Sequence, residues 1–181
     1  FGYGLSVTPL QTLTLYNAVA NDGVMVKPIF VSEIKEWNKT IKKYNTEVIN
    51  PKICSQETLD KVQAVLENVV KKGTGSKLYS KDFSMAGKTG TAQVNYKDKS
   101  KLYYASSFVG YFPADEPKYS CIIVVHKPNV AAGYYGADVA GPVFKRIAQK
   151  IFTDSPSMNH VKNIDAKVVS QEKSYAEYYK K

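Results

Sequence analysis

The chain has 181 residues, enough for one domain with a sizeable apolar core. Its 44% apolar and 23% charged content predicts a globular protein, and no apolar run approaches the roughly 18 residues of a membrane span. The net charge of +9 comes from lysines scattered along the chain rather than from a dense basic helix with interleaved aromatic residues, which argues against nucleic-acid binding.

The first predicted element is a helix that begins after Thr8. Thr8-Pro9-Leu10-Gln11 combines an N-cap threonine, a proline at the first helical position and a glutamine at the third. We expect this helix to end at Asn21-Asp22-Gly23, with Gly23 in the left-handed conformation. Its apolar residues cover most of its circumference, so we expect it to need neighbours beyond this short chain.

Two β-rich runs follow at about 25–37 and 41–49, and Asn38-Lys39 is the predicted turn of a peripheral hairpin. A second helix is expected over about 56–72, capped by Ser55 and ended by Gly73. Leucines and valines at helical spacing form its apolar face. These residues are Leu59, Val62, Leu66, Val69 and Val70.

Three strands are predicted close together, at about 84–94, 103–112 and 119–127. Their connections are short and polar, which implies an antiparallel meander. The third strand holds consecutive aliphatic residues, so we expect both of its faces to be covered and Cys121 to be an inert buried thiol. With only one further cysteine, Cys54, no disulfide framework is predicted.

A third helix is expected to run from Gly141-Pro142 to about Phe152 and to cover the sheet. Its buried stripe is predicted to hold Val143, Phe144, Ile147, Ala148 and Ile151. Composition changes at Thr153, and the charged remainder is predicted to be a poorly ordered end or a helix against another domain. The prediction is therefore an α+β domain portion at 1–152, an antiparallel sheet covered by helices, followed by a linker and charged tail at 153–181.

The segment Lys88-Thr89-Gly90-Thr91, on the first strand of the meander, carries the most information about function. It places a cation, two hydroxyls and flexible backbone together, flanked by small residues. Small residues let another backbone approach closely, and lysine and hydroxyl donors can hold an anion. The segment therefore suits an extended ligand that ends in a carboxylate. The plainer alternative is a small-residue strand packed under a helix.

Five segments, in the same order, resemble class B penicillin-binding proteins, the transpeptidases of division and elongation. They are Phe1–Gln11, Val69–Gly75, Ala86–Gln93, Ser107–Pro113 and Tyr134–Phe144, and the third contains the family's K-T-G motif. The resemblance covers residues 1 to about 152. It implies the C-terminal half of a transpeptidase domain with the serine β-lactamase-like fold.

The nucleophile motif of this family, S-x-x-K at a helix N-terminus, has no fitting counterpart. Ser32-Glu33-Ile34-Lys35 lies in the predicted hairpin, where residues three apart point to opposite faces. Ser170-Gln171-Glu172-Lys173 follows the K-T-G strand and is out of order, as is Ser157-Met158-Asn159, which mimics the second motif, S-x-N. His126 and His160 form no triad or metal cluster, and no cofactor is expected. We therefore expect the isolated chain to be inactive.

In the family, a serine attacks the carbonyl between the terminal D-alanines of a peptidoglycan stem peptide, and a neighbouring amine then forms the cross-link. Penicillins mimic that D-Ala-D-Ala end. The resemblance implies that Lys88 supplies positive potential, that the Thr89 and Thr91 hydroxyls bind the substrate carboxylate, and that the Thr91 N–H is an oxyanion donor. Gly90 would keep the strand clear for an added substrate strand. Gln93, at the far end of the strand, is a weaker candidate.

Tyr134 and Tyr135 lie between the third strand and the last helix, as rim packing or as an aromatic wall beside the cleft. The resemblance implies stem peptides and β-lactams as ligands, and the upstream half of the domain and wall-synthesis or division proteins as partners. It also implies the outer side of the bacterial inner membrane, with an anchor upstream of Phe1. Two alternatives stay open: a β-lactam sensor or β-lactamase relative, and a non-enzymatic basic module that binds an anionic polymer.

Overall fold

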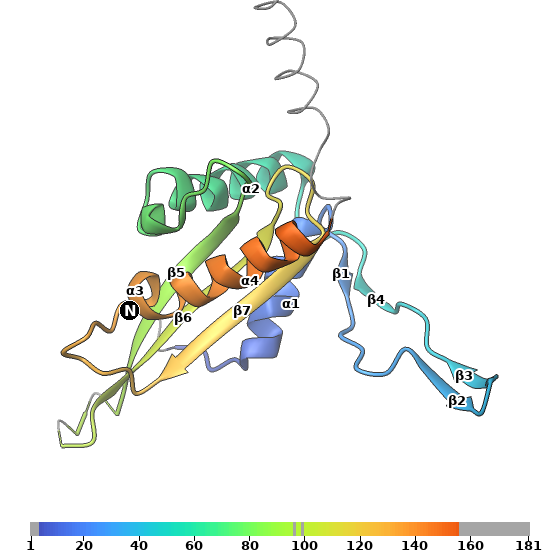
Figure 1. The fold of residues 1–181 in the computed structure, drawn as a ribbon, viewed down its shortest axis with the longest axis horizontal. Helices are drawn as coiled ribbons and strands as arrows, with labels where there is room; N and C mark the ends of the chain where they lie inside the picture. Colours follow the sequence, from blue (N-terminus) through green and yellow to red (C-terminus); the bar gives the residue numbers. More distant parts are fainter. Residues whose placement is uncertain (1–3, 96, 99, 156–181) are drawn as a thin grey trace, which may run out of the picture. The chain divides into compact units, whose positions relative to one another are not determined.

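The computed structural model describes residues 4–95, 97–98 and 100–155. The chain divides into two compact units, Phe1–Arg146 and Ile147–Lys181. The helices and strands, shown in Figure 1, are α1 (Pro9–Ala20), β1 (Met25–Val26), β2 (Glu33–Glu36), β3 (Lys39–Lys43), β4 (Val48–Asn50), α2 (Gln56–Lys71), the 3-10 turn η1 (Ser76–Leu78), β5 (Ala86–Val94), β6 (Tyr103–Phe112), β7 (Tyr119–His126), α3 (Gly136–Val139) and α4 (Gly141–Asp154). Within the second unit, Lys150 of α4 donates to the Asp154 carboxylate at 2.7 Å.

The central sheet is an antiparallel meander in the order β5-β6-β7, which confirms the predicted arrangement. The register between β5 and β6 runs without a break from Ala86 opposite Tyr111 to Val94 opposite Tyr103. Among the described strands, β5 pairs with β6 alone, so it forms an edge of the sheet. This edge leaves alternate backbone N–H and C=O groups of β5 without a partner strand.

Helix α1 begins as its sequence predicts. The Thr8 hydroxyl accepts from the Gln11 N–H at 3.2 Å, and the Thr8 N–H donates to the Gln11 side chain at 2.8 Å, so the capping box is complete. At the other end Gly23 has a φ of +81° and its N–H donates to Ala18 O at 2.8 Å. The predicted left-handed glycine therefore closes the helix.

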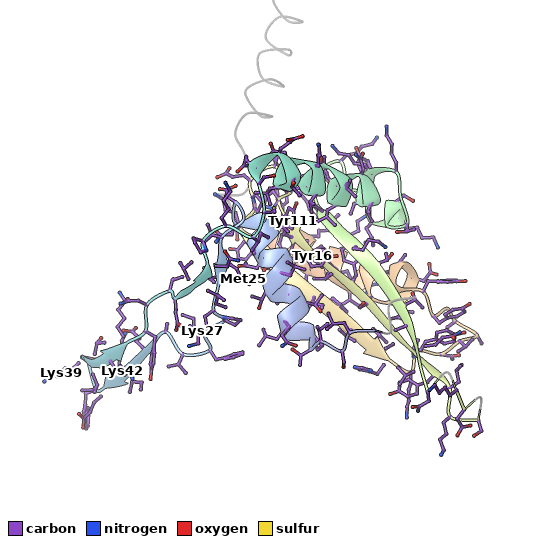
Figure 2. All side chains as sticks on the ribbon, turned by 180° about the vertical axis from the view of Figure 1, so that it is seen from behind. Tyr16, Met25, Lys27, Lys39, Lys42 and Tyr111 are labelled. Carbon is purple, nitrogen blue, oxygen red and sulfur yellow. The ribbon has the colours of Figure 1, made fainter. Side chains whose placement is uncertain are left out.

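Two helices cover one face of the sheet. Val19 of α1 and Leu59 and Leu66 of α2 form one buried cluster with Ala86 and Tyr111 of the sheet. Figure 2 views α1 and α2 from this side and labels Tyr16, which packs against the cluster, and Tyr111. The Tyr111 hydroxyl is buried and has no hydrogen-bond partner among the described residues. Burial, with a smaller effect of the Glu67 charge, raises the pKa of Tyr111 to about 12.

The opposite face of the sheet carries an aromatic cluster. Successive residues of a strand point to opposite faces, so Phe108 and Phe112 lie on the face opposite Tyr111. Phe144, at the start of α4, contacts both of them, with ring centroids 4.7 Å and 5.6 Å apart. The predicted covering role of this helix is thus confirmed at Phe144, whereas Val143 is 41% exposed and does not belong to the buried stripe.

The hairpin departs from the prediction at its turn. Glu36 pairs with Lys39, so the two-residue loop is Trp37-Asn38 rather than Asn38-Lys39. Trp37 adopts a φ of +53°, a conformation that its type rarely takes, and nothing in its side chain signals that choice. The β2–β3 hairpin continues from the short β1–β4 pair and lies away from the three-stranded sheet (Figure 1).

Two further expectations need correction. Residues 121–125 of β7 are half-buried rather than covered on both faces, because β7 is the other edge of the sheet among the described strands. Cys121 is accordingly half-buried, although burial still raises the pKa of its thiol. The short helix α3 was not predicted. None of the helices in the described part of the chain is long and apolar enough to cross a bilayer.

Candidate functional site

The K-T-G-T segment occupies the middle of the edge strand β5. Thr89 pairs with Phe108, and Thr91 pairs with Ser106. Because side chains alternate along a strand, both threonines lie on the face that carries Phe108, and Lys88 lies on the other. The segment therefore presents one open backbone edge with a cation on one side and two hydroxyls on the other.

Lys88 is exposed and directs its ammonium group along the strand. Its Nζ donates to the Thr89 carbonyl oxygen at 3.0 Å and lies 3.3 Å from Thr89 Oγ1. No carboxylate of the described residues forms an ion pair with it. Its positive charge is therefore available to an anionic ligand at this edge.

Both threonine hydroxyls contact loops that pack on the same face. Thr89 Oγ1 lies 3.0 Å from Thr74 Oγ1, in the loop after α2. Thr91 Oγ1 accepts from the Gly136 N–H at 3.1 Å. A hydroxyl that accepts in this way keeps its own O–H for donation. Thr91 can therefore donate to a ligand oxygen, and so can Thr89 when Thr74 is the donor to it.

Glycine lets the loop before α4 touch the strand. A Cβ on Gly136 would lie 2.2 Å from the Ser107 carbonyl oxygen and 2.5 Å from that of Gly90. A Cβ on Gly90 would lie 2.5 Å from Ser107 Oγ. Real Cβ atoms do not approach this closely. At Gly136 the atoms met belong to the backbone, so glycine there is what permits the contact, whereas at Gly90 the atom met is a side-chain oxygen that can turn away.

The predicted tyrosines form a stack beside this contact. The Tyr134 ring lies between those of Tyr104 and Tyr135, with centroids 4.2 Å and 4.4 Å away. The hydrogen bond to Tyr135 and the charge of Tyr135 raise the pKa of Tyr134 to about 12, so the Tyr134 phenol is neutral at physiological pH. The Ser106 hydroxyl donates to the Tyr134 carbonyl oxygen, which anchors the loop to β6.

Both predicted roles of Tyr134 and Tyr135, packing at the rim and an aromatic wall beside the cleft, are compatible with this stack. Tyr134 is partly buried in the stack, while Tyr135 is 55% exposed and follows directly before Gly136. Gln93 sits farther along β5, with its Nε2 atom 3.4 Å from the Tyr104 hydroxyl. This contact joins Gln93 to the tyrosine stack, and its part in ligand binding stays a prediction.

Sequence reasoning assigned no role to Thr74, Ser106 or Gly136, although all three touch the site. Thr74 and Gly136 lie in two of the segments that resemble the family, Val69–Gly75 and Tyr134–Phe144, and this resemblance was the available signal. Ser106 lies in none of the five segments, and its contact joins it to a residue 28 positions away. Such pairings follow from the folded topology alone.

The structure describes some of the residues that could mimic the nucleophile motif or form a histidine site. Lys35 lies in strand β2 and its Nζ pairs with Glu33 at 2.7 Å, so Ser32 and Lys35 do not form a helical S-x-x-K motif. Ser157, His160 and Ser170 lie outside the described residues. His126 ends β7. Across the described ranges, no group of three or more His, Cys, Asp or Glu side chains could hold a metal ion.

The fold and the site together match a known family. Residues 1–149 match the penicillin binding protein transpeptidase domain. The chain belongs to this family, and it corresponds to part of a class B transpeptidase domain, as the motifs predicted.

Several relatives are similar over most of this chain. The peptidoglycan D,D-transpeptidase FtsI of Buchnera aphidicola subsp. Baizongia pistaciae is 34% identical over 83% of this chain and 25% of its own length. Stage V sporulation protein D of Bacillus subtilis is 34% identical over 81% of this chain and 23% of its own length. The chain thus spans about a quarter of the length of these curated relatives.

Solved structures agree with these matches. Penicillin-binding protein 3 from Mycobacterium tuberculosis, in its apo form, has a TM-score of 0.72 and 30% identity over 86% of this chain and 37% of its own. The same protein in complex with aztreonam has a TM-score of 0.71 and 29% identity over the same shares of the two chains.

Proposed function

We propose that this chain forms the substrate-holding wall of a peptidoglycan D,D-transpeptidase whose nucleophilic serine lies elsewhere in the full-length protein. The observation that carries the proposal is the open edge of β5, where Lys88 and the hydroxyls of Thr89 and Thr91 are together. Curated relatives of this chain are named peptidoglycan D,D-transpeptidases, which supports the same reaction.

The ligand would bind as an added strand along β5. Its backbone would use the unpaired groups of the edge, and its terminal carboxylate would meet the Thr89 and Thr91 hydroxyls in the field of Lys88. A stem peptide ending in D-Ala-D-Ala has this form, and so does a β-lactam with its carboxylate. The complex of penicillin-binding protein 3 with aztreonam supports β-lactams as ligands.

The reaction is an acyl transfer. The serine oxygen attacks the carbonyl carbon between the two D-alanines, the C–N bond breaks, and D-Ala leaves with a proton on its amine. The amine of a neighbouring stem peptide then takes the acyl group and releases the serine. In this scheme the Thr91 N–H donates to the developing oxyanion, and one such donor is typically worth about 3 kcal/mol of transition-state stabilisation.

The cellular setting follows from the same proposal. A protein that cross-links peptidoglycan acts in the bacterial cell envelope, on the outer side of the inner membrane, and works with other wall-synthesis or division proteins. The upstream part of its own domain, with the nucleophile, would complete the site against β5. The proposed acyl transfer uses no cofactor.

A fluorescent penicillin tests the proposal. The full-length protein should be labelled, and Thr89→Val with Thr91→Val should slow its acylation at least tenfold, because the carboxylate loses both hydroxyl donors. Thr40→Val is the matched control, since Thr40 contacts Glu33 on the hairpin, away from β5. The isolated 181-residue chain should stay unlabelled. Labelling of that chain at Ser32 or Ser170 would contradict the proposal.

A further inference from the structure

We propose that Thr74 is a positioning residue that orients the Thr89 hydroxyl toward the substrate carboxylate. This inference rests on the proposed function of Thr89 and adds a residue from a different element. The two hydroxyl oxygens lie 3.0 Å apart, although the residues are separated by 15 positions and by the turn η1.

The loop that carries Thr74 is held tightly at the end of α2. The N–H groups of Gly73 and Gly75, on either side of Thr74, both donate to the Val69 carbonyl oxygen, at 3.1 Å and 2.9 Å. The Gly73 carbonyl oxygen accepts in turn from the Ser76 N–H at 3.0 Å. These bonds hold the backbone on both sides of Thr74, and from this position its exposed side chain reaches Thr89.

A second attachment ties this loop to the segment that contacts Thr91. Lys77, three residues after Thr74, forms an ion pair with Asp138 of α3 at 2.6 Å. Helix α3 begins with Gly136, whose N–H donates to Thr91. The two loops that contact the site threonines are therefore joined to each other on the same face of β5.

The chemistry of a hydroxyl explains why the contact matters. Thr89 has a single O–H hydrogen and two acceptor positions. When Thr74 donates to Thr89, the Thr89 hydrogen is left to point at a ligand oxygen. Among the described residues, the other contact of Thr89 Oγ1 is a long hydrogen bond from Lys88 Nζ at 3.3 Å. Without Thr74, this long bond alone orients the hydroxyl, so we expect its O–H to be less well directed.

The test uses the full-length protein with a carboxylate-bearing β-lactam and the methyl ester of the same compound. Thr74→Val removes the hydroxyl at nearly constant shape, and Thr74→Ser retains it. We expect Thr74→Val to raise the Kd for the carboxylate probe about fivefold, the effect of one hydrogen bond, without changing the acylation rate constant of the bound complex. The ester should bind both proteins equally, and Thr74→Ser should stay within twofold of the wild type.

The outcomes separate this inference from the proposed function. Equal weakening for both probes, or a Thr74→Ser variant as weak as Thr74→Val, would mean that Thr74 only packs, and would overturn the inference. If Thr89→Val loses the preference for the carboxylate probe while Thr74→Val keeps it, the inference fails and the role of Thr89 stands. If Thr89→Val keeps that preference, both fail. Thermal melting of each variant, with Thr74→Ala as a second truncation and Thr40→Val as control, verifies that the proteins compared are folded.

Discussion

At the scale of single residues, the buried Tyr111 hydroxyl is the least satisfied group of the core. It contributes a large apolar ring to the cluster under α1 and α2, yet its O–H finds no partner among the described residues. A buried polar group without a partner costs about 1–3 kcal/mol, whereas its removal can be neutral or stabilising. The ring of Tyr111, and not its hydroxyl, therefore stabilises the fold.

We predict that Tyr111→Phe raises the free energy of unfolding by about 1 kcal/mol, because it removes the unpaired hydroxyl and keeps the ring. Urea unfolding at neutral pH measures the change. The folded pKa of about 12 exceeds the ordinary value of 10, so the unfolded state ionises first. Wild-type stability should therefore fall as pH rises from 10 to 12, and the advantage of the variant should widen there. A destabilised variant would indicate a partner for the hydroxyl.

At the scale of elements, the sequence predicted helices and strands wherever a local signal existed. Thr8 and Gln11 marked the start of α1, and the short polar connections marked the meander. The four-residue helix α3 was missed because so short a helix shows no apolar period. The hairpin turn was predicted one residue too late, because a tryptophan with positive φ has no sequence signature.

In the candidate site, too, residues within one local motif could be predicted and contacts between distant segments could not. Lys88 and Thr91 were predicted as site residues because they lie together in one motif, and their role in binding stays a prediction. Their supporting contacts could not be predicted, because Thr74 and Gly136 reach the strand from loops whose positions depend on how α2 and the sheet pack. The motif thus identified the strand, and the folded structure was needed to find what holds its side chains.

Helix α2 offers a prediction at this scale. The Ser55 hydroxyl accepts from the Thr58 N–H at 3.2 Å and caps the helix that supports the Thr74 loop. We predict that Ser55→Ala lowers the free energy of unfolding by about 1 kcal/mol, because the cap is lost. Ser55→Asp is the control and should retain most of the stability. Urea unfolding compares the three proteins, and equal loss in both variants would assign the effect to something other than the cap.

At the scale of the whole molecule, the chain exposes apolar side chains on its first helix. Leu10 and Leu15 of α1 are 39% and 48% exposed, as expected for a helix with apolar residues around most of its circumference. The chain spans about a quarter of the length of its curated relatives, the first of which it covers at 25%. We infer that the exposed apolar residues of α1 meet another part of the full-length protein.

We predict that the isolated 181-residue chain self-associates through the exposed apolar residues of α1, because water disfavours exposed apolar surface. Leu10→Ser with Leu15→Ser should shift the chain toward monomer in sedimentation velocity experiments. Ile41→Ser, which changes an exposed apolar residue of the hairpin, is the matched control. A chain that is monomeric at every concentration, or a control that acts as strongly as the α1 variant, would contradict the prediction.

The contact between Gly136 and Gly90 limits which sequence changes the proposed site can accept. Every replacement of Gly136 adds a Cβ that would fall within 2.5 Å of two backbone oxygens, which no rotamer can avoid. Point mutation therefore has almost no tolerated outcome at this position. Changes of shape in this part of the proposed site are therefore expected at neighbouring side chains such as Thr74 or Tyr135, which are both exposed.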